Sequence, residues 1–209
     1  MVLLFDAANT LIHKPLLFEK AAGVLESFGH SIPMNFLKQR HKLVSEIIVF
    51  PDRTDKEFYR KFNSEWLYAL GILPKDEILN GLFEACSYLP WEKFEDTEIL
   101  SEIKGEKAIL SNFHGSLTNL IESKFPGIFK EIVISENEKF RKPDSRFYLT
   151  AIEKLKVEPK DILYIGDSLK LDVEPAESTG IRSLLIDRDN EFPYFKNRIQ
   201  SFKEITKFI

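Results

Sequence analysis

The stretch VLLFDAANTLI (residues 2–12) opens with a short apolar run and becomes polar at Asp6. The run is too short for a stable helix and does not alternate, which is typical of a strand buried on both faces. Asp6 is therefore expected directly after a buried strand. In an open parallel sheet, ligands bind beyond the carboxyl ends of the strands, so this carboxylate lies where chemistry is expected.

Further apolar runs of the same kind occur at residues 107–110, 131–135, 161–166 and 182–186. The segments between them have apolar residues at helical spacing, at about 115–124, 145–156 and 172–179. Strands that alternate with helices form a parallel sheet with helices on both faces. The pattern therefore predicts an α/β fold with a Rossmann-like, three-layer core.

The gap between the first two predicted strands is much longer than one crossover helix requires. Within it, apolar residues recur at three- and four-residue spacing over residues 16–28, 34–49, 55–70 and 75–88. Prolines separate these segments, as expected between helices. We therefore expect an all-helical cap domain at 13–89, inserted into a core domain that comprises 1–12 and 90–209. The aromatic residues of this cap are expected in its core.

Composition limits the classes of partner. The net charge is −4, which gives no argument for nucleic-acid binding. The single cysteine, Cys86, excludes an intrachain disulfide and a Cys-rich zinc site, and it favours a reducing compartment such as the cytoplasm. The sequence lacks an apolar stretch near the roughly 20 residues that a bilayer requires and a basic signal-peptide start. We expect neither a nucleic-acid nor a membrane partner, and the sequence gives no signal for an oligomeric state.

Polar residues follow several of the predicted strands. Ser111 and Asn112 come after the second, Lys142 lies in the loop after the third, and Asp167 follows the fourth, with Asp172 one turn later. Each of Ser111, Asn112 and Asp167 alone could be a helix N-cap. Their coincidence with Asp6 at one edge of a sheet favours a site instead.

The residue types at this edge restrict the chemistry. Carboxylates from different strands suit Mg²⁺, which prefers oxygen ligands. A lysine and a hydroxyl beside the metal suit a phosphoryl group, and a carboxylate can itself attack phosphorus. The set therefore indicates a small phosphorylated substrate.

The chain resembles the haloacid dehalogenase-like hydrolases, most of which are Mg²⁺-dependent phosphatases. The resemblance is carried by LLFDAANTLI (3–12), AILSNF (108–113), RKPDSRFY (141–148) and ILYIGDSLKLDVEPAESTGI (162–181), in the order of the family's motifs. It implies a helical cap inserted after the first motif.

The resemblance also implies roles for the metal-binding residues. Asp6 would be the nucleophile and a Mg²⁺ ligand, and Asp167 would be a second ligand. Asp172 would support the metal through water, and the backbone carbonyl of Ala8 would complete the set. Thr10 would help to shape the loop after the first strand.

On the substrate side, the resemblance assigns Ser111 to the phosphoryl oxygens, with help from backbone amides near Asn112. Lys142 would pair with Asp6 and with the phosphate. Asn9 stands where the family usually has glycine. Since Asn enters left-handed backbone conformations at low cost, the turn is expected to form.

Ala8 departs from the family pattern, which has an aspartate there as general acid and base. Such a group contributes about 10²–10⁴-fold to rate. Three interpretations follow: a slow or selective phosphatase, a phosphonate hydrolase that uses a cap lysine such as Lys38 or Lys42, or a degenerate phospho-ligand-binding protein. His13 and His114 are candidate replacements for the acid. A dehalogenase is disfavoured, since those relatives lack the Gly-Asp pair of residues 166–167.

Overall fold

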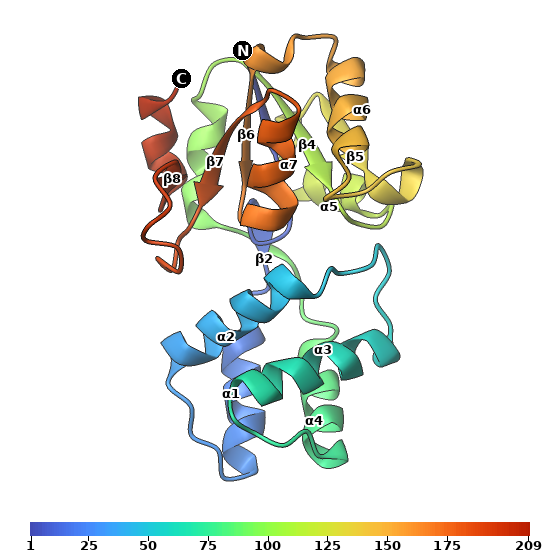
Figure 1. The fold of residues 1–209 in the computed structure, drawn as a ribbon, viewed down its shortest axis with the longest axis vertical. Helices are drawn as coiled ribbons and strands as arrows, with labels where there is room; N and C mark the ends of the chain where they lie inside the picture. Colours follow the sequence, from blue (N-terminus) through green and yellow to red (C-terminus); the bar gives the residue numbers. More distant parts are fainter. The chain divides into compact units, whose positions relative to one another are not determined.

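The computed structural model describes residues 1–209, and the chain divides into two compact units (Figure 1). Unit 1 comprises Met1–His13 and Lys93–Ile209, and unit 2 comprises Lys14–Glu92. The sequence predicts boundaries after residues 12 and 89, whereas the structure has them after His13 and Glu92. The short strands β2 (Ile12–His13) and β3 (Glu92–Lys93) pair with each other where the chain passes between the units.

Unit 1 contains a six-stranded parallel sheet in the order β5-β4-β1-β6-β7-β8. Its strands are β1 (Val2–Phe5), β4 (Glu106–Ser111), β5 (Glu131–Ile134), β6 (Ile162–Gly166), β7 (Arg182–Ile186) and β8 (Arg198–Ile199). The first five fall within two residues of the predicted runs. The expected α/β Rossmann-like architecture is confirmed.

The register of the sheet brings the polar residues of three strands to one edge. Phe5, the last residue of β1, lies opposite Ile109 in β4 and Ile165 in β6. The next residue, Asp6, donates its backbone N–H to the carbonyl of Ile165 at 2.9 Å. The residues that follow these three strands therefore converge at the carboxyl edge of the sheet.

Side chains of β1 alternate between two helical layers, as the period of a strand requires. Val2 and Leu4 belong to a core that includes Tyr148 of α6 and Ala176 of α7. On the other face, the ring of Phe5 packs against Phe129 and Phe202 at centroid distances of 6.0 and 5.6 Å.

The helices of unit 1 surround the sheet as Figure 1 shows. The α-helices are α5 (Leu117–Lys124), α6 (Ser145–Leu155) and α7 (Glu174–Ser178), and the short helical turns are η1 (Glu95–Ser101), η2 (Ser135–Asn137), η3 (Pro159–Asp161), η4 (Leu169–Val173) and η5 (Phe202–Lys207). One prediction was imprecise: the helix expected at 172–179 is split into a π-helical turn, η4, and the short α7.

The C-terminal tail adds an element that the sequence pattern did not reveal. β8 pairs with β7 over only two residues, so it has no readable periodicity. The following turn, η5, buries Phe202 and Ile205 completely, so the tail packs against the core of unit 1.

Unit 2 is formed by α1 (Leu17–Ser27), α2 (Met34–Ile47), α3 (Lys56–Ala69) and α4 (Asp76–Cys86). Its core contains Phe62 and Trp66, and the indole N–H of Trp66 donates to the carbonyl of Leu37 at 3.2 Å. Tyr68 is an exception to the expected aromatic core, because 56% of it is exposed. No helix in the chain combines the length and the apolar character needed to cross a bilayer.

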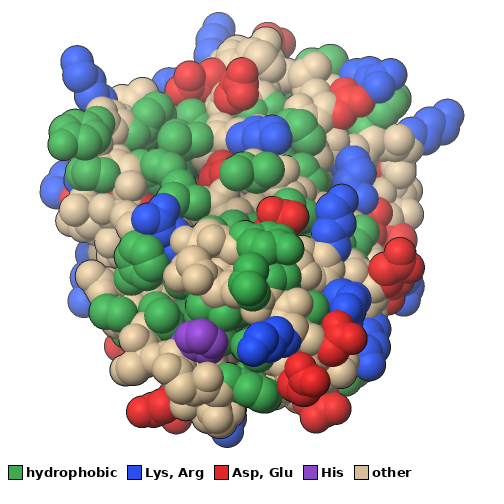
Figure 2. Space-filling view, turned by 60° about the horizontal axis from the view of Figure 1, so that its bottom comes forward, with side chains coloured by type: hydrophobic (Ala, Val, Ile, Leu, Met, Phe, Trp, Pro, Cys, Tyr) green, Lys and Arg blue, Asp and Glu red, His purple; other side chains and the backbone are tan.

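Charged side chains of both signs share the surface drawn in Figure 2. Lys and Arg lie among Asp, Glu and apolar side chains on that face, without a continuous basic area. This distribution agrees with the net charge of −4.

Candidate active site

Four polar side chains from four separate segments meet at the carboxyl edge of the sheet. Asp6 follows β1, Ser111 ends β4, Lys142 precedes α6 and Asp172 lies in η4. All four are buried, with Asp6 7% exposed and Lys142 2% exposed. Buried charges are costly unless they are paired, so this cluster needs a specific arrangement of partners.

Asp6 is held through one of its two carboxylate oxygens. Its Oδ1 atom accepts hydrogen bonds from the Ser111 hydroxyl at 3.1 Å and from the Lys142 ammonium at 2.7 Å. The Oδ2 atom accepts neither of these bonds. One oxygen is thus fixed by the protein while the other is available to a ligand.

Lys142 bridges two carboxylates. Its Nζ atom lies 2.7 Å from Asp6 Oδ1 and 2.7 Å from Asp172 Oδ1. Asn112 positions the Lys142 backbone, since the Asn112 amide donates to the Lys142 carbonyl at 2.9 Å and its oxygen accepts from the Lys142 N–H at 2.8 Å. The Asn112 side chain therefore supports the lysine and is not directed at a ligand.

Asp172 is fixed from several directions. Besides Lys142, its Oδ1 atom accepts from the Tyr164 hydroxyl at 2.8 Å, and its Oδ2 atom accepts from the Ser168 N–H at 3.0 Å. Sequence reasoning missed Tyr164. The available signal was a hydroxyl within an otherwise apolar strand, where a buried Tyr needs a polar partner.

The helix-cap interpretation of the polar residues is wrong for Ser111, Asn112 and Asp167. The N-cap position of α5 is Ser116, and that of η4 is Ser168, whose hydroxyl accepts from the Leu171 N–H at 2.9 Å. The Ser111 hydroxyl donates to Asp6 instead.

Three carboxylates form a group that fits a divalent cation. Oxygen atoms of Asp6, Asp167 and Asp172 all lie within 4.8 Å of one another, and Asp167 is the least buried of the three. An all-oxygen set of this kind suits Mg²⁺, which uses one or two carboxylates and keeps several waters. Both oxygens of Asp172 already accept hydrogen bonds, which disfavours Asp172 as a direct ligand of the cation.

The cluster has perturbed protonation equilibria. Burial raises the pKa of Asp6 to about 6, and the charges of Asp172 and Asp167 act in the same direction while Lys142 opposes them. Burial alone would lower the pKa of Lys142, but the carboxylates of Asp172 and Asp6 outweigh it and raise that pKa. Lys142 is therefore a permanent cation, and excess negative charge remains for a metal to neutralise.

The loop after β1 has the conformation expected from its residue types. Asn9 has a φ of 60°, in the left-handed region that its residue type tolerates. The N–H groups of Leu11 and Ile12 both donate to the Ala7 carbonyl, at 2.8 and 3.0 Å. Thr10 is fully buried, and its hydroxyl has no hydrogen-bond partner.

The two histidines considered as substitutes for the missing acid have other contacts. The ring of His13 stacks on Phe94 at a centroid distance of 3.9 Å. The Nδ1 atom of His114 lies 2.7 Å from the Ser116 hydroxyl. These contacts give neither imidazole a direct link to Asp6, and a catalytic role for them stays a prediction.

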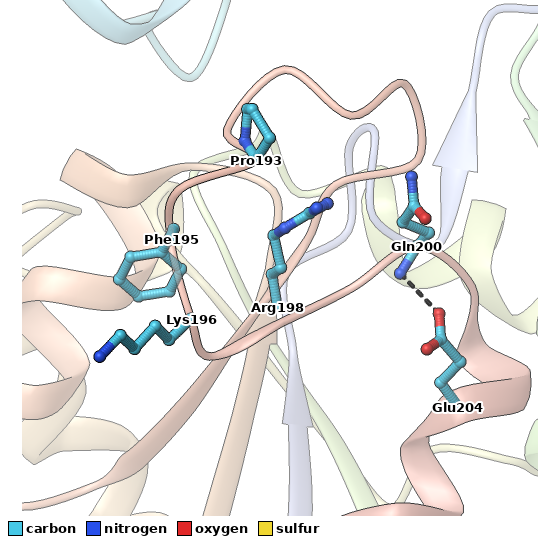
Figure 3. A pocket seen from close by; sticks show the side chains of 6 residues that line it. All are labelled: Pro193, Phe195, Lys196, Arg198, Gln200 and Glu204. Atoms are coloured by element: carbon cyan, nitrogen blue, oxygen red, sulfur yellow. Dashed lines mark hydrogen bonds between the residues drawn. The ribbon is translucent and has the colours of Figure 1, made fainter.

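A pocket of about 370 Å³ lies elsewhere, in the C-terminal tail. Figure 3 shows that its side chains point in different directions, and Glu204 accepts from the Gln200 N–H at 2.8 Å. Arg198 is ion-paired with Asp187 at 3.2 Å. Because the pocket is open and lacks converging reactive groups, we do not assign the chemistry to it.

Comparison with known proteins agrees with this geometry. Residues 97–186 match the model of the family described as haloacid dehalogenase-like hydrolase. Haloacid dehalogenase-like hydrolase domain-containing protein 3 of Danio rerio is 28% identical over 123 residues, which are 54% of this chain and 49% of that protein. The alignment thus spans about half the length of this relative.

Two further similarities extend over most of the chain. The glyceraldehyde 3-phosphate phosphatase of Pyrococcus furiosus is 23% identical over 200 residues, covering 88% of this chain and 79% of that protein. The crystal structure of the HAD hydrolase YfnB of Bacillus subtilis, bound to magnesium, has a TM-score of 0.66 at 20% identity and covers 99% of this chain and 97% of that one. At this identity the structural similarity establishes the fold.

The similarity to this family is visible in the sequence, in the sheet and in the site. The family model matches the segment that carries the last three motifs. The sheet has the architecture of the solved structures, and the motif residues Asp6, Ser111, Lys142 and Asp172 are in contact at one edge of it. We conclude that residues 97–186 match the haloacid dehalogenase-like hydrolase family and that the whole chain is similar to its members in fold.

Proposed function

We propose that the protein is a Mg²⁺-dependent phosphohydrolase that acts on a small phosphorylated metabolite through an aspartyl-phosphate on Asp6. The observation that carries the proposal is the position of Asp6: it is buried, held at one oxygen by Ser111 and Lys142, and close to two further carboxylates. The similarity to the glyceraldehyde 3-phosphate phosphatase of Pyrococcus furiosus supports a phosphate ester as the substrate class.

In this proposal Asp6, Asp167 and the Ala8 carbonyl would hold the metal, with Asp172 acting through water. Bound Mg²⁺ supplies positive charge that offsets the repulsion between Asp6 and the phosphate. The three nearby carboxylate groups and their all-oxygen chemistry support this assignment.

The chain's own residues account for the bond changes. A carboxylate oxygen of Asp6 attacks phosphorus while the bond from phosphorus to the ester oxygen breaks. The Ser111 hydroxyl and the Lys142 ammonium bind phosphoryl oxygens and stabilise the charge that they carry in the transition state. Water then attacks the aspartyl-phosphate, which releases inorganic phosphate and restores Asp6.

Ala8 limits the turnover rate expected of the proposed phosphohydrolase. Its methyl group can neither protonate the departing alkoxide nor take a proton from the attacking water. Solvent must therefore supply the first proton and accept the second. Loss of a general acid and base costs about 10²–10⁴-fold. The enzyme should therefore prefer substrates whose leaving group is already acidic.

Ala8 also supports the rival function, a protein that binds Mg²⁺ and a phosphorylated ligand without useful turnover. A phosphonate hydrolase has less support. Its Schiff base needs a neutral lysine, whereas Lys42 is ion-paired with Glu46 at 3.1 Å and Lys38 lies 5.8 Å from the ring centre of Phe18.

The proposal is tested by turnover on a panel of phosphate esters, including triose phosphates and aryl phosphates, with and without Mg²⁺. Asp6→Asn is the control, because it keeps the size of the side chain but weakens the nucleophile. We expect Mg²⁺-dependent release of phosphate that the variant lacks. Equal background rates in both proteins would reject the enzyme function and leave the binding function.

Two measurements test the role of Ala8. With an aryl phosphate, formation of the aspartyl-phosphate should outpace its hydrolysis, so an initial burst of aryl product is expected. Ala8→Asp should raise turnover by about 10²-fold or more if the rest of the site is complete. A folded Ala8→Asp variant with no gain would favour the degenerate, ligand-binding function.

A further inference from the structure

Arg188 contacts the loop that follows β1, although 178 residues separate it from Thr10. It lies just beyond the carboxyl end of β7. Its Nη2 atom donates to the Thr10 carbonyl at 3.0 Å, and its Nη1 atom donates to the Asn9 carbonyl at 3.2 Å. One guanidinium group therefore holds two successive peptide groups of this loop.

The same guanidinium is anchored to a carboxylate on its other side. Nη2 and Nε donate to the two oxygens of Asp96, at 2.9 and 3.3 Å. Asp96 in turn accepts from the backbone N–H of Phe202 at 2.9 Å. The loop after β1 is thus connected through Arg188 to η1 and to the C-terminal turn η5.

Aromatic rings enclose the guanidinium. It lies 3.8 Å from the ring centre of Phe94 and 5.1 Å from that of Phe202, and its side chain is 18% exposed. Burial lowers the pKa of Arg188, while Asp96, Asp167 and Asp189 oppose this change. Arginine nevertheless stays charged in proteins, and its planar fork matches both the carboxylate and the two carbonyls.

The loop that Arg188 holds begins with the proposed nucleophile. Asp6 is at its start, the Ala8 carbonyl is a proposed metal ligand, and Asn9 has a positive φ that few residue types adopt easily. Bonds to the Ala7 carbonyl close the loop internally. Contacts at Asn9 and Thr10 restrict the remaining freedom of the peptide groups beside Ala8.

We propose that Arg188, oriented by Asp96, is a positioning residue that holds the loop after β1 in its metal-binding conformation. The inference rests on the proposed function for the identity of the ion. It assigns a role to the segment after β7, which none of the sequence motifs covers.

The test is calorimetric titration of the full-length chain with Mg²⁺, well below the unfolding temperature. Outer contacts of metal ligands contribute about 10–100-fold to metal affinity, and we expect a loss in that range for Arg188→Ala. Arg188→Lys keeps the positive charge but loses the planar guanidinium group, so its Mg²⁺ affinity should lie between those of Arg188→Ala and the wild type. The matched control is Arg182→Ala, which removes an exposed arginine from the other end of β7 and should leave the affinity unchanged.

The outcomes separate the possible roles. If Arg188→Ala lowers only the thermal midpoint and binds Mg²⁺ like the wild type, Arg188 is merely structural and the inference is overturned. If Arg188→Ala does not fold, the same titration is made with Arg188→Lys and Asp96→Asn. Unchanged Mg²⁺ affinity in both of these variants would also overturn the inference.

Failure of the proposed function is a different result. A wild type that binds Mg²⁺ but hydrolyses no ester, together with weakened binding in Arg188→Ala, supports the positioning role and rejects only the enzyme proposal. A wild type that does not bind Mg²⁺ overturns both.

Discussion

Gly166 and Asp172 are packed so closely that no side chain fits between them. A Cβ atom on Gly166 would lie 2.3 Å from the carboxyl carbon of Asp172 and 2.5 Å from its Cβ atom. Asp172 has little room to withdraw, because Lys142, Tyr164 and the Ser168 N–H all hold its carboxylate. The glycine at the end of β6 is therefore required for space.

Gly166→Ala should displace the Asp172 carboxylate and weaken its hydrogen bonds. Overpacking of this kind costs about 1–3 kcal/mol of unfolding free energy, which urea denaturation measures. Gly23→Ala is the matched control, because no atom lies within 4 Å of the added methyl group on α1. That control should gain about 0.5–1 kcal/mol, since alanine is the better helix former. Equal stabilities for Gly166→Ala and the wild type would contradict the packing argument.

Lys142→Met should leave Asp6 and Asp172 as buried carboxylates without a cation. Removing one partner of a buried ion pair costs about 3–5 kcal/mol. Burial raises the pKa of Asp6 to about 6 in the presence of Lys142, and removal of this cation should raise it further. Protonation of Asp6 therefore relieves the penalty in the variant near and below pH 6, and the loss of stability grows as the pH rises above 6. The measurement is urea denaturation in metal-free buffer on both sides of pH 6.

The control for this charge effect is Lys154→Met on the exposed surface of α6, where the ion pair with Glu138 should contribute at most about 1 kcal/mol. A destabilisation of Lys142→Met that does not change with pH would show that packing, and not charge, is responsible.

Thr10→Val should leave stability unchanged or increase it. The Thr10 hydroxyl is buried without a partner, and its removal relieves a desolvation cost of about 1–3 kcal/mol. Thr97→Val is the matched control, because the buried Thr97 hydroxyl donates to the Phe94 carbonyl at 2.5 Å. Loss of this hydrogen bond should lower the free energy of unfolding by about 0.5–1.5 kcal/mol. A Thr10→Val variant that loses stability as Thr97→Val does would reveal a partner for this hydroxyl.

His41 should make unit 2 sensitive to acid. Its ring lies within 5.2 Å of the ring centres of Phe18, Phe62 and Trp66, and burial together with the nearby Lys42 charge lowers its pKa from 6.5 to about 4. Neutral His41 thus stabilises the fold above pH 6.5, and this contribution declines as the pH falls toward 4. The urea midpoint of His41→Phe should fall less between pH 7 and 5 than that of the wild type, and identical slopes would argue against the assignment.

The architecture can be predicted from the local sequence pattern. The strand β1 and its parallel neighbours are short continuous apolar runs, and the helices of unit 2 have clear three- and four-residue spacing. The left-handed turn at Asn9 follows from residue type alone. In each case the physical cause lies within a few residues of chain, so the pattern records it.

Other features depend on contacts that no pattern records. β8 is too short to have a period, and the π-helical turn η4 places Asp172 against Gly166 only because Lys142 and Tyr164 hold it there. Asn112 is a residue type suited to ligand binding, yet it supports the Lys142 backbone.

Strand period and motif spacing are local properties, so the α/β class, the inserted helices and the candidate residues Asp6, Ser111, Lys142 and Asp172 can be predicted from the amino-acid sequence. The bridge that Lys142 makes between two carboxylates and the contact of Arg188 with the loop after β1 are visible only in the folded chain. Those contacts join residues 136 and 178 positions apart, and their geometry is set by the parallel register of the sheet and by side-chain packing.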